Sequence, residues 1–209
     1  MNRHILKFVF LTTFFAVHTA QFNEEPIMRN NVITMNSNQP LQAEDAQMAK
    51  DTVNIGLSKK TRDGVIELLN IILAHEYVLY TKTLNYHWNV YGMQFHDLHA
   101  FFKDQYEKLF EYADDVAERV ATLGGRPVST LKEFLSISTI KEVTSVPTAY
   151  DMMQDLLEGH ELIIRLLRQG IADTQEKLAD AGTNNFLTDL MEKHEKVAWM
   201  LRSSVKKAK

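Results

Sequence analysis

The sequence predicts an all-α protein, built as a four-helix bundle with one long crossover. Apolar residues recur at spacings of three and four in four segments between residues 58 and 203, which is the period of an amphipathic α-helix. Glycine or proline separates these segments, and a long connection, residues 126–147, joins the second segment to the third. Four such helices with one long crossover are typical of a helical bundle.

The composition limits the classes of protein that the chain can belong to. Its 209 residues, of which 24% are charged and four are proline, fit one domain with tails. The absence of cysteine excludes a disulfide framework and a thiolate metal site. A formal net charge of −4 means that nucleic-acid binding needs a local basic segment. No apolar run reaches the ~18 residues of a membrane-spanning helix, so we expect no membrane partner.

The first segment, residues 1–20, has two interpretations. It follows the plan of a secretory leader peptide, with a basic start, a short apolar centre and the small residue Ala20 at the cut. His18, however, stands where that plan requires a small residue. The second interpretation is a start codon assigned too far upstream, with Met28 or Met35 as the true beginning.

The next segment, residues 21–57, is rich in Asn, Gln and Glu and shows little periodicity. We therefore expect a flexible N-terminal arm. Acidic residues outnumber basic ones in it, which makes it a poor phosphate binder. The folded domain then covers residues 58–209.

The first helix is expected from about Ser58, with Ser58 or Thr61 as its N-cap, to about Val90. His87 therefore lies near its C-terminal end. The apolar stripe of this helix comprises Val65, Leu68, Leu69, Ile72, Leu73, Tyr80 and Leu84.

The second helix is expected from near Phe95 to Gly124-Gly125, because glycine commonly ends a helix. His96, Asp97 and Asp115 are expected on its solvent face. Its buried stripe comprises Leu98, Phe101 or Phe102, Tyr106, Leu109, Ala113, Val116 and Val120.

The third helix is expected to start at Thr148, which has an acidic residue three positions later as in a capping box, and to end before Gly182. The last helix is expected over about residues 185–203. Each of these helices carries one histidine, His160 and His194, and we interpret both as structural or exposed.

The C-terminal tail, from Arg202 onward, holds four basic residues and no acidic residue. The first interpretation is that its cations favour the negative end of the last helix dipole. The alternative is a DNA contact through Lys206, Lys207 and Lys209, repeated in a multimer so that weak contacts add.

Two histidines and two carboxylates form a candidate metal-ligand set: His87, His99, Asp114 and Glu118. Imidazole and carboxylate ligands suit iron, manganese or zinc. His87 and His99 flank a break at Gly92 and converge if the second helix folds back on the first. Asp114 and Glu118 are four residues apart, so they share one face of a helix.

The spacing separates this set into two halves. His99 and Asp114 are fifteen residues apart. On one helix that separation is about 22 Å, whereas metal ligands lie about 2 Å from their ion. One hypothesis is a two-fold axis that brings the histidines of one subunit to the carboxylates of the other, twice in each dimer. The alternative, that all four are ordinary helix-surface residues, stays open on spacing alone.

Two blocks of sequence resemble the Dps family, the DNA-protecting mini-ferritins of starved bacterial cells. The first block runs from His87-Trp88-Asn89-Val90 through the second helix to Leu123-Gly124-Gly125. The second is His194-Glu195-Lys196 followed by Ala198-Trp199-Met200-Leu201-Arg202. The resemblance implies a ferritin-like four-helix bundle whose crossover carries a short helix, and a hollow shell of twelve subunits. No Glu in the chain has a His three positions after it, which excludes the di-metal site that conventional ferritins build inside one bundle.

The same resemblance implies a function and its residues. His87 and His99 would bind iron together with Asp114 and Glu118 of the neighbouring subunit, and these four would act as a ferroxidase. The implied protein oxidises Fe(II), preferably with hydrogen peroxide, and stores Fe(III), which protects the cell from oxidative damage.

The chain departs from the family pattern at Lys103, where an Asp or Glu usually supplies a fifth ligand. An ammonium group has no lone pair for a metal. Asp104 is adjacent but lies about 100° further around the helix. We therefore expect one well-formed iron position and a weakened or differently built second one.

Two further hypotheses compete with the ferroxidase. Lys103 and the basic tail support a structural, DNA-compacting shell with an impaired ferroxidase site.

Members of the family are usually cytoplasmic, so we expect a cytoplasmic protein with access to the nucleoid. Export, as an adhesion or signalling assembly, is the alternative if residues 1–20 are a true signal peptide.

Overall fold

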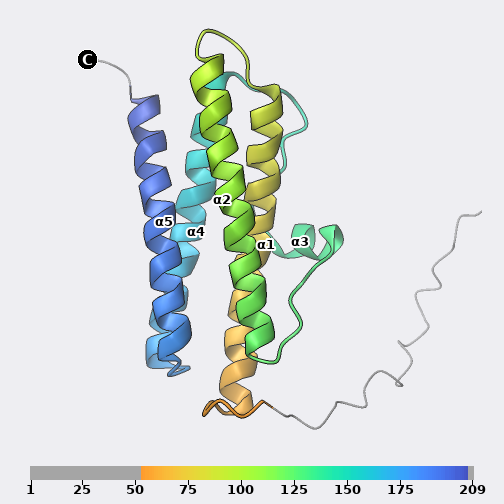
Figure 1. Ribbon diagram of the computed structural model, residues 1–209, viewed down its shortest axis with the longest axis vertical. Coiled ribbons are helices and arrows are strands. Elements are labelled where there is room, and N and C mark those ends of the chain that lie inside the picture. The colour runs from red at the N-terminus through yellow and green to blue at the C-terminus, as the bar shows by residue number, and fades with distance from the viewer. Residues whose placement is uncertain (1–52, 207–209) are drawn as a thin grey trace, which may run out of the picture. The chain divides into compact units, whose positions relative to one another are not determined.

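The computed structural model describes residues 53–206, so the predictions for residues 1–52, Lys207 and Lys209 lie outside the described residues. Within 53–206 the chain forms five helices and no strand. The helices are α1 (Lys59–Asn89), α2 (Phe95–Thr122), α3 (Leu131–Ile137), α4 (Ala149–Glu176) and α5 (Ala181–Val205). Figure 1 shows the four long helices side by side, with the short α3 next to α1.

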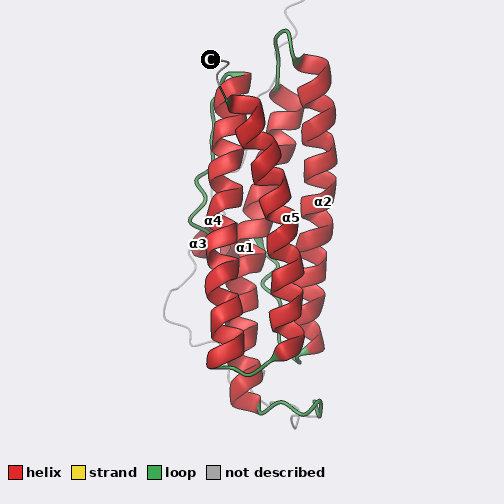
Figure 2. Cartoon of the chain, turned by 90° about the vertical axis from the view of Figure 1, so that its left-hand side faces the viewer, coloured by secondary structure: helices red, strands yellow, loops and turns green. Residues whose placement is uncertain are grey.

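The long helices pack as two hairpins. α1 contacts α2, α4 contacts α5, and contacts between α1 and α4 join the two hairpins. The connection from α2 to α4 runs along the bundle and carries α3, which packs on α1 (Figure 2). The predicted all-α, four-helix bundle with a short helix in its crossover is confirmed. No helix within residues 53–206 is both long and apolar enough to cross a membrane.

Side-chain caps begin the helices where the sequence predicted them for α1 and α4. Ser58 Oγ accepts a hydrogen bond from the Thr61 backbone N–H at 3.1 Å, and Thr148 Oγ1 accepts one from Asp151 N–H at 3.2 Å. Each cap satisfies a backbone donor that the first turn of a helix leaves unpaired.

The predicted start of the last helix was wrong. α5 begins at Ala181, earlier than the expected start near Asn185, because Asp180 is its N-cap. Asp180 Oδ1 accepts from Thr183 N–H at 3.1 Å, and this capped first turn tolerates Gly182. The sequence pattern suggested a loop there because glycine commonly marks the end of a helix.

The end of α2 depends on Gly124. Its φ is +82°, a left-handed conformation that side chains disfavour. A Cβ atom at this position would lie 2.6 Å from Val53 Cγ2. The chain therefore leaves α2 at Thr122 through a glycine that no other residue replaces without strain.

The core lies along the predicted apolar stripes. Its fully buried side chains include Leu69, Ile72, Leu79, Phe102, Leu109, Met152, Leu156, Ile163, Leu167 and Leu187. Phe102 is buried and Phe101 is only half-buried, which settles the register of α2. His96, Asp97 and Asp115 are exposed, as predicted.

The crossover is fastened to α1 by His75. Its Nδ1–H donates to the Ile71 carbonyl oxygen at 2.7 Å, and its Nε2 accepts from the Thr139 backbone N–H at 3.1 Å. Burial lowers the pKa of His75, and the Nε2 lone pair is needed for the bond to Thr139. The neutral ring thus joins the two segments.

Candidate metal centre

The structure brings His87 and His99 together. His87 lies in the last turn of α1 and His99 in the second turn of α2, and the chain reverses between them at Gly92, whose φ is +104°. The two imidazole rings stack, with 3.9 Å between their centroids and 23° between their planes. The convergence that the Gly92 break predicted is present in the fold.

Reciprocal hydrogen bonds fix both rings. His87 Nδ1 lies 2.8 Å from the His99 carbonyl oxygen, and His99 Nδ1 lies 2.9 Å from the His87 carbonyl oxygen. A carbonyl oxygen only accepts, so each Nδ1 must carry the proton. In the neutral ring the lone pair then resides on Nε2, which is the nitrogen left to bind a metal. The backbone thus selects the tautomer of both histidines.

Two aromatic side chains contact the imidazole pair, Phe95 stacked on His99 and Tyr106 tilted by 59° to His87. The Phe95 ring lies 5.0 Å from the His99 ring at 27°, and the Tyr106 ring lies 5.2 Å from the His87 ring. His87 is buried and His99 is half-buried. These contacts leave the imidazoles little freedom to rotate, so a metal would meet a preformed pair of ligands.

Asp114 and Glu118 lie far along α2 from this pair. Both are exposed and share one face of the helix, one turn apart. Asp114 lines a surface pocket of about 280 Å³ together with Phe110, Ala117 and residues of the crossover. Its carboxylate is therefore accessible to a molecule that docks on this face.

One chain does not complete a metal site from these four residues. His99 and Asp114 lie on the same unbroken helix, α2, which separates them by about 22 Å. Within residues 53–206 no three His, Asp or Glu side chains converge so as to hold a metal ion. The structure thus contains two half-sites, an imidazole pair and a carboxylate pair.

Lys103 is an ammonium group in an ion pair. Its Nζ donates to Glu107 Oε1, one turn further along α2, and this hydrogen bond raises the pKa of Lys103. Lys103 therefore offers no lone pair to a metal. The adjacent Asp104 is also engaged, since its Oδ2 accepts from Lys108 Nζ at 2.7 Å.

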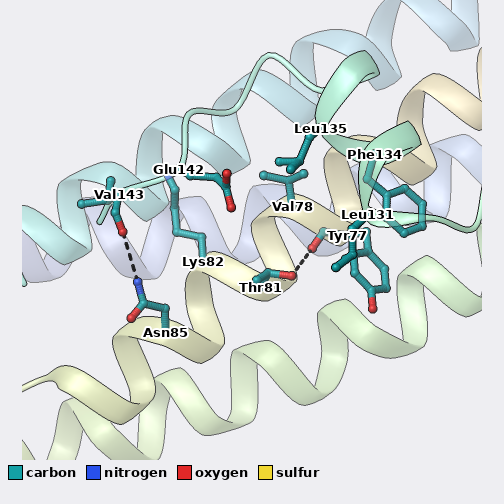
Figure 3. Close-up of a pocket in the computed structure, with 10 residues that line it drawn as sticks. All are labelled: Tyr77, Val78, Thr81, Lys82, Asn85, Leu131, Phe134, Leu135, Glu142 and Val143. Atoms are coloured by element: carbon teal, nitrogen blue, oxygen red, sulfur yellow. Dashed lines mark hydrogen bonds between the residues drawn. The ribbon is translucent and has the colours of Figure 1, made fainter. Parts of the chain in front are cut away.

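The face formed by α1, α2 and α3 is apolar and hollowed. A second pocket, of about 180 Å³, adjoins the one at Asp114 and shares Tyr77, Leu131 and Phe134 with it. Figure 3 shows these side chains with Val78, Leu135 and Val143 around the pocket. Leu131, Leu135 and Phe110 remain about half exposed or more at 67%, 49% and 55%. Contiguous exposed apolar surface of this kind is typical of a protein–protein interface.

Sequence reasoning missed a second polar cluster, in the core. His160 and His194, interpreted as structural or exposed, are both buried, and they form a hydrogen-bonded chain with Glu76. The sequence held a signal for Glu76, because it occupies the apolar register between Ile72 and Leu79. A stripe defined by its apolar members alone leaves Glu76 out.

A ferritin-like domain family matches residues 66–209 of the chain. An uncharacterised low temperature-induced protein of Nostoc sp. is 48% identical over 154 residues, which cover 73% of this chain and 86% of that protein. DNA protection during starvation protein 2 of Bacillus anthracis is 39% identical over 139 residues, which cover 66% of this chain and 94% of that protein.

Solved structures that resemble this chain include proteins of the same kind as its sequence relatives. The crystal structure of a Dps protein from Vibrio cholerae O1 superposes with a TM-score of 0.72 at 34% identity, covering 76% of this chain and 99% of that one. That protein is described as a member of a broad superfamily of ferritin-like diiron-carboxylate proteins.

Proposed function

Because the chain belongs to the Dps family of ferritin-like proteins, we propose that it is a ferroxidase and iron-storage protein. It oxidises Fe(II), with hydrogen peroxide as the preferred oxidant, and sequesters Fe(III). The observation that carries the proposal is the locked pair of His87 and His99, whose Nε2 atoms are left as ligands by their reciprocal hydrogen bonds.

The two half-sites support a site shared between subunits. A two-fold axis that sets α2 against the α2 of a second copy brings the histidines of one chain to the carboxylates of the other. The hollowed apolar face at Asp114 supplies a surface for that contact. We propose a homo-oligomer, a hollow shell of twelve subunits in accordance with the family resemblance, in which every two-fold contact forms two sites.

The ligand chemistry fits iron as the substrate. Asp114 and Glu118 provide hard anionic oxygens, which favour Fe(III) over Fe(II). Hydrogen peroxide accepts one electron from each of two Fe(II) ions. Together with two protons, these electrons reduce it to two water molecules. This two-electron route avoids the release of hydroxyl radical, provided that two ferrous ions are close together.

Lys103 weakens the second iron position in this proposal. The ammonium group lies on α2 one turn after His99, where it repels a cation and binds none. The first iron position, formed by two imidazoles and two carboxylates, does not depend on this residue. We therefore expect iron binding to persist and the paired oxidation step to be slower than with a carboxylate at position 103.

The test is Fe(II) oxidation by hydrogen peroxide without oxygen, scored as iron oxidised per peroxide consumed. Wild type is expected to oxidise about two irons per peroxide. His99→Ala is expected to abolish the reaction, and Lys103→Asp to accelerate it. His96→Ala is the matched control, because His96 is an exposed histidine on the same helix and should change nothing. A wild type that is inactive until Lys103 is replaced would favour the second candidate.

The second candidate is a structural shell that compacts DNA. The observations in its favour are the cationic Lys103 and the exposed Lys206 at the end of α5. Lys207 and Lys209 lie outside the described residues. Both candidates assume a cytoplasmic protein with access to the nucleoid, and N-terminal sequencing of the native chain decides between this location and export.

A further inference from the structure

A buried hydrogen-bonded chain of three side chains crosses the bundle core. Glu76 of α1, His160 of α4 and His194 of α5 are exposed by 0%, 1% and 0%. His194 Nε2 lies 2.8 Å from Glu76 Oε1, and His194 Nδ1 lies 2.9 Å from His160 Nδ1. Glu76 belongs to one helical hairpin and both histidines belong to the other. The three hydrogen-bonded side chains therefore bridge the two hairpins of the bundle.

The two hydrogen bonds fix the smallest number of protons that the three side chains need. Each of the two hydrogen bonds needs one proton, so two protons suffice when His160 donates to His194 and His194 donates to Glu76. In that state both rings are neutral and Glu76 is ionised, which leaves one net negative charge in the core. The second carboxylate oxygen, Glu76 Oε2, is buried and has no hydrogen-bond partner among residues 53–206. A buried charge with no opposite charge is costly.

The surrounding groups do not neutralise this charge. From α2, the Tyr112 ring lies 5.6 Å from the His194 ring, and burial followed by nearby negative groups, Glu76 first, raises the pKa of Tyr112 to about 12. Lys193 of α5 lies over Tyr112 but is paired with Asp189 at 2.7 Å.

On the helix of Glu76 itself, burial lowers the pKa of the adjacent His75, whose bonds to the backbone require a neutral ring. Among the ion pairs of residues 53–206, Glu76 has His194 as its only partner. The negative charge can therefore be neutralised by a third proton, shared among Glu76, His160 and His194.

We propose that Glu76, His160 and His194 form a proton latch, which holds one additional proton in each folded subunit and joins the two hairpins. With three protons the latch is neutral and both hydrogen bonds remain. His194 Nδ1–H donates to His160 Nδ1, and the third proton lies between His194 Nε2 and Glu76 Oε1. The proton belongs to the pair, because its placement on the ring or on the carboxylate leaves the count unchanged.

The latch is sensitive to pH in both directions. Loss of the third proton restores the uncompensated negative charge beside Glu76 Oε2. A fourth proton on His160 Nδ1 would face the Nδ1–H of His194, and two donors cannot bond to each other. Burial, and then the neighbouring His194, lower the pKa of His160 well below its ordinary value, which keeps this ring neutral as the latch requires. Either change loosens the contact between α1 and the α4–α5 hairpin.

The test counts protons released when the assembled protein unfolds in guanidinium at pH 8, in weak buffer with an indicator dye. In the unfolded chain at this pH, free carboxyl and imidazole groups have both lost their protons. Wild type is expected to release about one more proton per subunit than Glu76→Gln. An amide at position 76 accepts from His194 without any charge, so that variant needs no third proton. His160→Gln is the matched control, because its amide oxygen accepts from His194 Nδ1 and the extra proton should remain.

Equal proton release from wild type and Glu76→Gln would overturn the latch. If Glu76→Gln does not fold, infrared spectra of wild type at pH 8, with isotope-labelled glutamate or histidine, test whether the third proton is present. The folded protein is expected to show a protonated carboxyl group or an imidazolium ring. The absence of both signals would overturn the proposal equally.

Discussion

Mixing two inactive variants tests whether the iron site is shared between subunits. The first variant, His87→Ala/His99→Ala, lacks the imidazole half-site, and the second, Asp114→Ala/Glu118→Ala, lacks the carboxylate half-site. Since about 22 Å of α2 separates His99 from Asp114, neither chain can complete a site by itself. Each variant alone should be inactive in Fe(II) oxidation by peroxide.

A mixed dimer has one intact site and one empty site. The chain with intact histidines meets the chain with intact carboxylates at one of the two contacts, and the other contact has neither half. Random assembly at equal amounts makes about half of the dimers mixed, so about one quarter of the wild-type sites should return. Dissociation and reassembly with two affinity tags, followed by initial rates of Fe(II) oxidation, gives the measurement.

The matched control mixes wild type with a variant that carries all four alanine substitutions. A site shared between chains leaves about one quarter of the sites active, whereas a site within one chain leaves about half. An inactive mixture of the two half-site variants, with mixed assemblies confirmed by the tags, would refute the two-fold reasoning. The histidines and carboxylates would then act separately.

The remaining predictions concern stability and DNA. Burial lowers the pKa of His160 and His75, so below pH 6.5, about the ordinary histidine pKa, the unfolded chain binds more protons than the folded one. Stability is therefore expected to fall as the pH drops through 6.5 towards the folded-state pKa values. Denaturation midpoints measured from pH 7 to 5 check this. His160→Gln should make the midpoint fall less steeply with pH. Gly124→Ala should lower the free energy of unfolding by about 1–3 kcal/mol because φ is positive at this position. The loss should exceed that of Gly56→Ala, where φ is also positive but no atom lies within 4 Å of the new Cβ. Equal denaturation midpoints for the two variants would contradict the crowding argument. Removal of residues 206–209 should weaken DNA retardation in a gel and leave Fe(II) oxidation intact, and unchanged retardation would exclude a role for the tail.

Much of the fold follows from local patterns in the sequence. The stripes of α1 and α2 place Leu69 and Phe102 in the core because a helix buries every third or fourth residue. The Gly92 break predicted that His87 and His99 converge if the second helix folds back on the first, and the structure meets that condition. The start of α5 was missed because an Asp180 cap outweighs a glycine in the first turn.

Contacts between distant backbone atoms could not be predicted. The lock on His87 and His99 depends on carbonyl oxygens at the ends of two helices, and only the folded loop brings them within reach of the rings. The hydrogen-bond partner of Glu76, His194, lies on another helix at a sequence separation of 118 residues, so the register of Glu76 in the apolar stripe shows its burial but not its hydrogen bond.

The most direct test of the account is to locate iron in the assembled protein. Crystals soaked anaerobically with Fe(II) are examined by anomalous diffraction at the iron edge. We predict a peak at the two-fold contact, about 2 Å from the Nε2 atom of His87 or of His99 and adjacent to the partner subunit's Asp114 and the partner subunit's Glu118. Iron in the bundle core beside Glu76, or a two-fold contact without iron in crystals that have taken up the metal, would contradict it.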